Sequence, residues 1–179
     1  MFLSVPRLIL LLALASAVSL AAVSAAAPAA VDQAQKDHEF RKRIAEVNAK
    51  TGARQISAAD LQERLKRGER LVILDVREPE EMAVSALPGA RPAPLDEVGT
   101  MPLNGIPADA TVVTYCTVGY RSGKAAVALE RRLGRPVYNL EGGIIEWFNR
   151  GGRVVDPSGK PVDRIDSWGE PWSSYVHPR

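Results

Sequence analysis

Residues 111–122 read TVVTYCTVGYRS, and the only cysteine of the chain stands in the middle of this stretch. The β-branched and aromatic residues before the cysteine predict a strand over 111–115. A stripe of alanine and leucine at helical spacing predicts a helix over 122–133. Cys116 therefore opens a short loop, residues 116–121, that joins a strand to a helix.

The segments on either side continue the alternation of strands and helices. Residues 71–74, LVIL, form a continuous apolar run, which is typical of a strand buried on both faces of a sheet. Further predicted elements are a helix over 58–67 that Ser57 caps, one or two helical turns over 78–86, a third strand over 137–140 and a short helix over 144–149. Residues 87–107 contain five prolines and are predicted to be mostly loop, with a short helix over 95–98. These spacings predict an α/β fold with an open, mainly parallel sheet and helices on both faces.

The loop after the predicted strand 111–115 has the features of an anion site. In open parallel sheets, ligands bind beyond the carboxyl ends of the strands, and Cys116 lies at such an end. The free amides of a helix N-terminus favour an anion, and the thiolate is the nucleophilic form of cysteine. Gly119 allows the amides to turn inward, and Arg121 supplies a positive charge. The candidate site consists of Cys116 as the nucleophile and of a substrate-binding loop formed by Thr117, Val118, Gly119, Tyr120, Arg121 and Ser122, with Ser122 also expected to cap the helix.

An inert, buried cysteine at a strand end is the simpler interpretation of Cys116. That interpretation gives no role to Gly119, to Arg121 or to the strand–loop–helix context. The reactive interpretation accounts for all three.

Two further residues, Asp75 and Arg77, are expected to lie near the same edge of the sheet. Asp75 follows the predicted strand 71–74, so parallel strands would bring it to the edge that carries Cys116. It either pairs with Arg121 and orients it, or makes a hydrogen bond to loop backbone that maintains the fold. Arg77 is interpreted as structural, paired with Glu81 four residues later.

Residues 55–152 resemble the rhodanese-like family, as a single domain. The motifs that carry the resemblance stand in the family's order: Asp75-Val76-Arg77-Glu78 with Glu81, Leu87-Pro88-Gly89-Ala90, the loop from Cys116 to Ser122, and Leu140-Glu141-Gly142-Gly143-Ile144 with Trp147 and Gly151. The resemblance implies that Cys116 carries a persulfide within a loop that runs to Arg121. One departure is Ser85-Ala86, which stands where many members have Gly-His before the Leu-Pro-Gly-Ala string.

The resemblance implies a sulfurtransferase of the thiosulfate sulfurtransferase type. Such an enzyme moves sulfane sulfur from thiosulfate, or a similar small anionic donor, through a persulfide on Cys116 to a thiol or cyanide acceptor, with no metal or organic cofactor. A non-enzymatic binding module, or a relay that passes sulfur to an accepting protein, is the alternative. A phosphatase or arsenate reductase is disfavoured, because those relatives have one more residue between the cysteine and the arginine.

Composition excludes several other classes. The 23 basic and 21 acidic residues give a net charge of +2, which is too small for a typical nucleic-acid partner. A single cysteine rules out an intrachain disulfide framework and a cysteine-cluster zinc site. The only two histidines, His38 and His177, are far apart in the sequence and disfavour a histidine metal site.

The N-terminal sequence predicts an export signal over residues 1–27. Arg7 is its only charged residue, an apolar stretch follows, and Ala25-Ala26-Ala27 offers a cleavage pattern. The protein is then expected to be periplasmic or secreted, with an uncleaved membrane anchor as the alternative.

The rest of the chain divides into three predicted parts. Residues 28–52 form a helical lead-in, residues 53–155 the rhodanese-like domain, and residues 156–179 a tail rich in proline, glycine and tryptophan that packs on the domain. His177 is interpreted as a surface residue.

Overall fold

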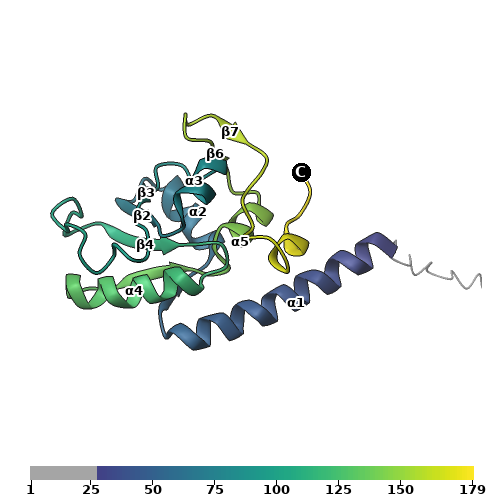
Figure 1. Ribbon diagram of the computed structural model, residues 1–179, viewed down its shortest axis with the longest axis horizontal. Helices are drawn as coiled ribbons and strands as arrows, with labels where there is room; N and C mark the ends of the chain where they lie inside the picture. Colours follow the sequence, from purple (N-terminus) through teal and green to yellow (C-terminus); the bar gives the residue numbers. More distant parts are fainter. Residues whose placement is uncertain (1–27) are drawn as a thin grey trace, which may run out of the picture.

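The computed structural model describes residues 28–179, so the export signal predicted for residues 1–27 lies outside the described residues. At its centre is a parallel sheet of five strands in the order β1-β5-β4-β2-β3 (Figure 1). The strands are β1 (Arg54–Ile56), β2 (Leu71–Asp75), β3 (Arg91–Pro92), β4 (Thr111–Tyr115) and β5 (Val137–Leu140). The predicted α/β fold with a parallel sheet is confirmed.

Strands β2 and β4 lie side by side in the middle of the sheet. Their register pairs Leu71 with Thr111 and Asp75 with Tyr115. Both strands are buried along almost their whole length, which explains why neither shows an alternating polar pattern. The register brings the ends of both strands to one edge, and Cys116 is the next residue after β4.

Helices cover both faces of the sheet. Helix α4 (Tyr120–Leu133) covers one face, where its Leu129 packs with Val112 of β4. Helices α2 (Ala58–Lys66) and α5 (Gly143–Asn149) cover the other, where Leu61 packs with Val113. Because successive side chains of a strand point to opposite faces, the neighbouring valines of β4 serve two separate cores.

A short helix, α3 (Pro79–Val84), follows β2 and begins with a local hydrogen bond. Proline at its first position lacks an amide that would otherwise be unpaired there. The Glu81 side chain accepts a hydrogen bond of 2.9 Å from the backbone amide of Glu78. This contact fixes Glu81 at the start of α3, on the side of the helix that faces the loop after β4.

The lead-in and the tail pack together alongside the domain. Helix α1 (Pro28–Thr51) fills almost the whole of the predicted helical lead-in and ends before Gly52, whose φ is +65°. The end of the domain, β6 (Val154–Val155), forms a small hairpin with β7 (Pro161–Val162) of the tail, and the tail also contains a 3₁₀ helix, η1 (Trp172–Tyr175). Figure 1 shows η1 against α1, and the rings of Phe40 and Tyr175 stack with centroids 5.0 Å apart. Helix α1 is polar, and none of the helices within residues 28–179 combines the length and apolar character needed to cross a membrane.

Some local predictions were wrong. Residues 95–100 form turns instead of a short helix, with amides that reach back three residues, from Glu97 to the carbonyl of Pro94 and from Thr100 to that of Glu97. The short strands β1 and β3 were not predicted, since two or three residues give too little pattern to detect. Helix α4 begins at Tyr120, two residues before the predicted start. Its N-cap is Gly119, so the expected capping role of Ser122 is wrong.

Candidate active site

Hydrogen bonds to its carbonyl groups hold the loop after β4, and one of its backbone amides donates to the cysteine sulfur. The carbonyls of Cys116 and Thr117 accept hydrogen bonds of 2.9 and 3.3 Å from the amides of Ile144 and Ile145, in the first turn of α5. The carbonyl of Gly119 accepts one of 3.1 Å from Asn139. In a trans peptide the amide points opposite to the preceding carbonyl, so the amides of Thr117, Val118 and Tyr120 face the inside of the loop. The amide of Gly119 donates to Cys116 Sγ at 3.2 Å.

Two glycines make this loop shape possible. Gly119 has a φ of +104°, a conformation that other residues rarely adopt. A Cβ on Gly143 would lie 2.3 Å from the carbonyl oxygen of Cys116, so only glycine lets α5 start this close to the loop. Gly142 and Gly143 also have positive φ values, of +69° and +58°, where the chain turns from β5 into α5.

Asn139, which the sequence analysis did not single out, ties the loop to the sheet. Its side chain donates to the carbonyl of Gly119 and to Gln55, and it accepts a 2.6 Å hydrogen bond from the hydroxyl of Ser122. Ser122 and Asn139 are both fully buried. Ser122 thus acts as a support behind the loop, with its side chain directed to β5.

Arg121 pairs with Glu81, not with Asp75. Its two terminal nitrogens donate to the two carboxylate oxygens of Glu81 at 2.6 and 2.7 Å, and one of them also contacts Thr117 Oγ1 at 2.9 Å. Thr117 in turn donates to the same carboxylate at 2.8 Å. Arg121 lies on the first turn of α4 and reaches across to α3, which explains why the Asp75–Arg121 pair, one of the two alternatives for Asp75, does not form.

The environment of this pair favours both charges. Burial acts to raise the pKa of Glu81, but hydrogen bonds from Arg121, from the amide of Glu78 and from Thr117 hold that pKa below its usual value. Burial acts to lower the pKa of Arg121, and Glu81 and the neighbouring Cys116 outweigh it, so that the pKa is raised. The arginine thus stays charged beside the sulfur, with its donors directed to the carboxylate.

Asp75 and Arg77 form a second ion pair, deeper in the protein. Arg77 donates from Nε to one oxygen of Asp75 at 2.9 Å and from Nη2 to the other at 2.6 Å, and Nη2 also contacts the carbonyl of Ser85 at 2.7 Å. The expected pair of Arg77 with Glu81 is therefore wrong. Its premise was helical i, i+4 spacing, and Arg77 precedes α3.

The hydroxyl of Tyr115 completes this buried cluster. It donates to Asp75 and accepts a 3.1 Å hydrogen bond from the amide of Leu87. Burial, followed by the charge of Asp75, raises the pKa of Tyr115 well above its usual value. Asp75 also accepts from the backbone amide of Arg77 at 3.1 Å, which corresponds to the fold-maintaining role of the two considered for it.

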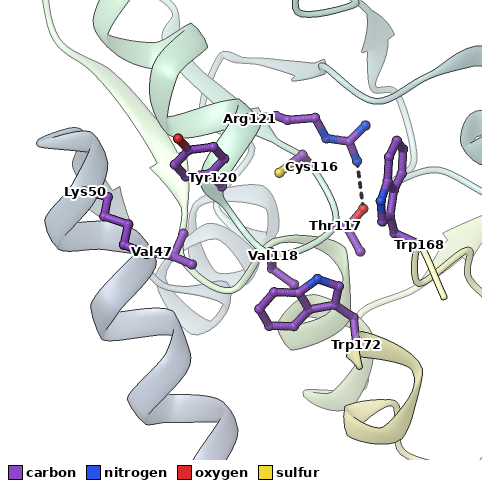
Figure 2. A pocket seen from close by; sticks show the side chains of 9 residues that line it. All are labelled: Val47, Lys50, Cys116, Thr117, Val118, Tyr120, Arg121, Trp168 and Trp172. Atoms are coloured by element: carbon purple, nitrogen blue, oxygen red, sulfur yellow. Dashed lines mark hydrogen bonds between the residues drawn. The ribbon is translucent and has the colours of Figure 1, made fainter. Parts of the chain in front are cut away.

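A cavity of about 390 Å³ opens in front of Cys116 (Figure 2). Its lining combines the loop residues Cys116, Thr117, Val118, Tyr120 and Arg121 with Val47 and Lys50 of α1 and with Trp168 and Trp172 of the tail. The ring of Trp168 stacks on the Arg121 guanidinium, 4.3 Å from its carbon to the ring centroid. Sequence reasoning missed the four residues from α1 and the tail, because no local pattern shows that these segments meet at the loop.

The loop, its cysteine and the parallel sheet agree with a comparison to known families, in which residues 57–150 match the rhodanese-like domain. The chain belongs to the rhodanese-like family. A sulfurtransferase from Allochromatium vinosum is 37% identical over 106 residues, which cover 59% of this chain and 97% of that protein. A solved rhodanese-related protein from Thermoplasma volcanium is 33% identical with a TM-score of 0.50, over 57% of this chain and 97% of its own.

The chain also matches part of a longer relative. A tRNA uridine(34) hydroxylase from Xanthomonas euvesicatoria is 40% identical over 91 residues, which are 48% of this chain and 37% of that protein. The chain thus spans well under half of this relative. All of α1 and the whole tail lie outside the residues that match the rhodanese-like domain.

Proposed function

We propose that this rhodanese-like protein is a sulfurtransferase that carries sulfane sulfur as a persulfide on Cys116. The observation that supports this function is the hydrogen bond of 3.2 Å from the Gly119 amide to Sγ, in a loop whose carbonyls at Cys116, Thr117 and Gly119 are bonded to other segments. Donors arranged in this way stabilise a compact anion without reorganisation during the reaction. The name of the Allochromatium vinosum relative, sulfurtransferase, agrees with this function.

The proposed first half-reaction loads the cysteine. The Cys116 thiolate attacks the outer sulfur of thiosulfate, or of a similar small anionic donor, and the sulfur–sulfur bond of the donor breaks. Sulfite leaves with the electron pair of that bond. The new persulfide anion lies where the loop amides and the N-terminus of α4 favour negative charge.

The second half-reaction unloads the cysteine. A thiolate or cyanide attacks the outer sulfur of the persulfide, and the bond between the two sulfurs breaks. The acceptor leaves as a persulfide or as thiocyanate, and Cys116 returns to the thiolate. This sequence gives ping-pong kinetics with a covalent intermediate.

Mass spectrometry of the purified protein after thiosulfate treatment tests the proposal. The expected result is a reducible adduct of about 32 Da, the mass of one sulfur atom, on Cys116. Cys116→Ser should show no adduct and no thiosulfate:cyanide activity while circular dichroism shows an unchanged fold. Activity retained in that folded variant would remove Cys116 from the mechanism.

The proposal extends to where the reaction takes place. Residues 1–27 carry the pattern of an export signal, which supports a mature protein that begins near Ala26–Pro28 and works outside the cytoplasm. Fractionation of the host followed by N-terminal sequencing tests this. Recovery of an intact Met1 in the membrane fraction would replace the exported protein with an anchored one.

A further inference from the structure

The cavity in front of Cys116 has walls that the rhodanese-like domain does not supply. Val47 and Lys50 come from α1, and Trp168 and Trp172 come from the tail, all outside residues 57–150. Figure 2 shows α1 on one side of the cysteine and the two tryptophans on the other. The loop provides the reactive end of the cavity, and the extensions provide its sides.

Contacts distant from the cysteine hold these walls in place. His177 Nε2 lies 2.8 Å from the carboxylate of Asp37 on α1, and Asn149 of α5 donates to the carbonyl of Tyr175 at 2.8 Å. Phe40 and Ile44 of α1 share a buried cluster with Tyr175 and the loop residue Val118. The tail is therefore fastened to both α1 and the domain, which gives the cavity a formed shape.

The walls of the cavity are more apolar than a binding site for an inorganic anion requires. Val47, Val118 and Trp172 present apolar surface to the cavity, and the large ring of Trp168 remains 55% exposed. Trp168 also has a φ of +63°, a strained conformation for a residue with a side chain, which persists only where surrounding contacts impose it. Cavities of about 300–1,000 Å³ with apolar walls and few polar groups are the usual form of sites for organic molecules.

The charges in the cavity place the anionic end of such a molecule. The donors of Arg121 face Glu81 and Thr117, and the amide of Gly119 donates to the sulfur of Cys116 at 3.2 Å. Lys50 is exposed at the rim of the cavity on α1. A sulfur compound with an anionic sulfur group and an apolar organic group matches this distribution, with the sulfur group at Cys116 and the organic group between the extensions.

We propose that α1 and the tail form a binding subsite for the organic group of a sulfane-sulfur donor such as an organic thiosulfonate. The inference rests on the proposed sulfurtransferase function and names the substrate class of the same cysteine. With an organic thiosulfonate as donor, the Cys116 thiolate attacks the outer sulfur and the bond between this sulfur and the sulfonyl sulfur breaks. The electron pair leaves with the sulfonyl group as a sulfinate, and the persulfide remains on Cys116.

A pair of donors isolates the contribution of the organic group. Benzenethiosulfonate and methanethiosulfonate share the reacting group and the charge and differ in the apolar part. Sulfur transfer to cyanide is followed as thiocyanate, and kcat/KM for the first donor is divided by kcat/KM for the second. Comparison of this ratio between variants cancels the intrinsic difference in reactivity between the two donors.

Trp172→Ala is the main variant, and Val47→Ser on the opposite wall is the second. We expect the ratio to fall about tenfold in Trp172→Ala, since an aromatic contact is lost, and about threefold in Val47→Ser. Leu65→Ala is the matched control, because Leu65 is a 41% exposed apolar residue of α2 that does not line the cavity, and its ratio should equal that of the wild type. Circular dichroism verifies the fold of each variant.

The remaining outcomes overturn the subsite. A ratio within twofold of the wild type in both folded variants would show that the extensions do not bind the organic group. If Trp172→Ala does not fold, Val47→Ser decides by the same criterion. If thiosulfate loads Cys116 and neither thiosulfonate does, the subsite is wrong and the sulfurtransferase function stands; if none of the three donors loads it, both are wrong.

Discussion

Two ion pairs lie close to the carboxyl edge of the sheet, and they differ in burial and in neighbours. In the Asp75–Arg77 pair, the side chains are 2% and 0% exposed, and their other contacts are Tyr115 and loop backbone. In the Glu81–Arg121 pair, the arginine is 18% exposed, lines the cavity and lies next to Cys116. The deeper pair supports the sheet edge from behind, whereas the shallower pair joins α3 to the cysteine loop.

Because the two ion pairs differ in burial and in neighbours, we expect them to have separate roles. A fully buried charge must keep its partner, so the Asp75–Arg77 pair is expected to act on stability. A charge at the rim of a cavity can also act on a ligand, so the Glu81–Arg121 pair is expected to act on the reaction. The following variants test whether the two tasks can be separated.

Arg77→Met should have the largest effect, on stability. The substitution leaves the carboxylate of Asp75 buried without its partner, and the free energy of unfolding should fall by about 3–5 kcal/mol. Urea unfolding at pH 7 measures the change. Arg70→Met is the control, because Arg70 pairs with Asp109 at the surface and should change stability by no more than about 1 kcal/mol. Equal effects in the two variants would remove the distinction drawn from burial.

Arg121→Ala should have its main effect on the reaction of anionic donors. Loss of a charge-assisted contact of about 1.5–3 kcal/mol corresponds to a decrease of roughly 10- to 150-fold in kcat/KM for thiosulfate. Steady-state kinetics with cyanide as acceptor provides the measurement. Arg121→Lys keeps the charge but not the paired donors, and it should recover only part of the loss. Unchanged kinetics in Arg121→Ala would make this residue purely structural.

Lowering the pH should weaken the Glu81–Arg121 pair, because Glu81 becomes protonated. Because the folded-state pKa of Glu81 is lowered, its contribution to stability is fully present above the pKa of the unfolded chain, about 4.3. The contribution is lost as the pH falls from there through the lowered folded-state pKa. Urea unfolding of the wild type and of Glu81→Gln between pH 7 and pH 3 should show a difference in stability that shrinks over this range. A difference that stays constant down to pH 3 would contradict the role of the charged form.

Trp168→Ala should have the smallest effect. The ring stacks on Arg121, and an exposed cation–π contact contributes about 0.5–1 kcal/mol, which corresponds to roughly two- to fivefold in kcat/KM for thiosulfate. Trp168→Phe should restore most of this loss because the face of the ring remains. The stacking role is wrong if the phenylalanine variant is as impaired as the alanine variant.

The two ion pairs also show which parts of the site could be predicted from the sequence. The strand, the loop and the position of Cys116 follow from local pattern, because strand and helix propensities and the loop glycine are all within residues 111–133. The predicted Arg77–Glu81 pair was wrong, and so was the alternative that paired Asp75 with Arg121, because pairing depends on where α3 starts and on which side chains face across the loop. Asn139 was missed for the same reason, since a buried amide within a strand gives no signal of its contacts.

The extensions were the least predictable part. The aromatics of the tail suggested packing, but not that Trp168 and Trp172 would line the cavity at Cys116. His177 was interpreted as a surface residue without an acid near it in sequence, and it is 30% exposed with Asp37, 140 residues earlier, at 2.8 Å. Contacts between residues so far apart in the sequence depend on the completed fold, and neither segment has a sequence pattern that predicts them.

The contact between α1 and the tail has a consequence for biosynthesis. Phe40 leaves the ribosome long before Tyr175, and at about 5–20 residues per second the 140 residues between Asp37 and His177 take roughly 7–30 s to translate. During that time the face of α1 that Tyr175 will cover stays open to other chains. The loop around Cys116 is also translated before Trp168 and Trp172. The newly made thiol therefore first meets its surroundings without those two walls, and the proposed subsite for an organic donor forms only after the tail has docked.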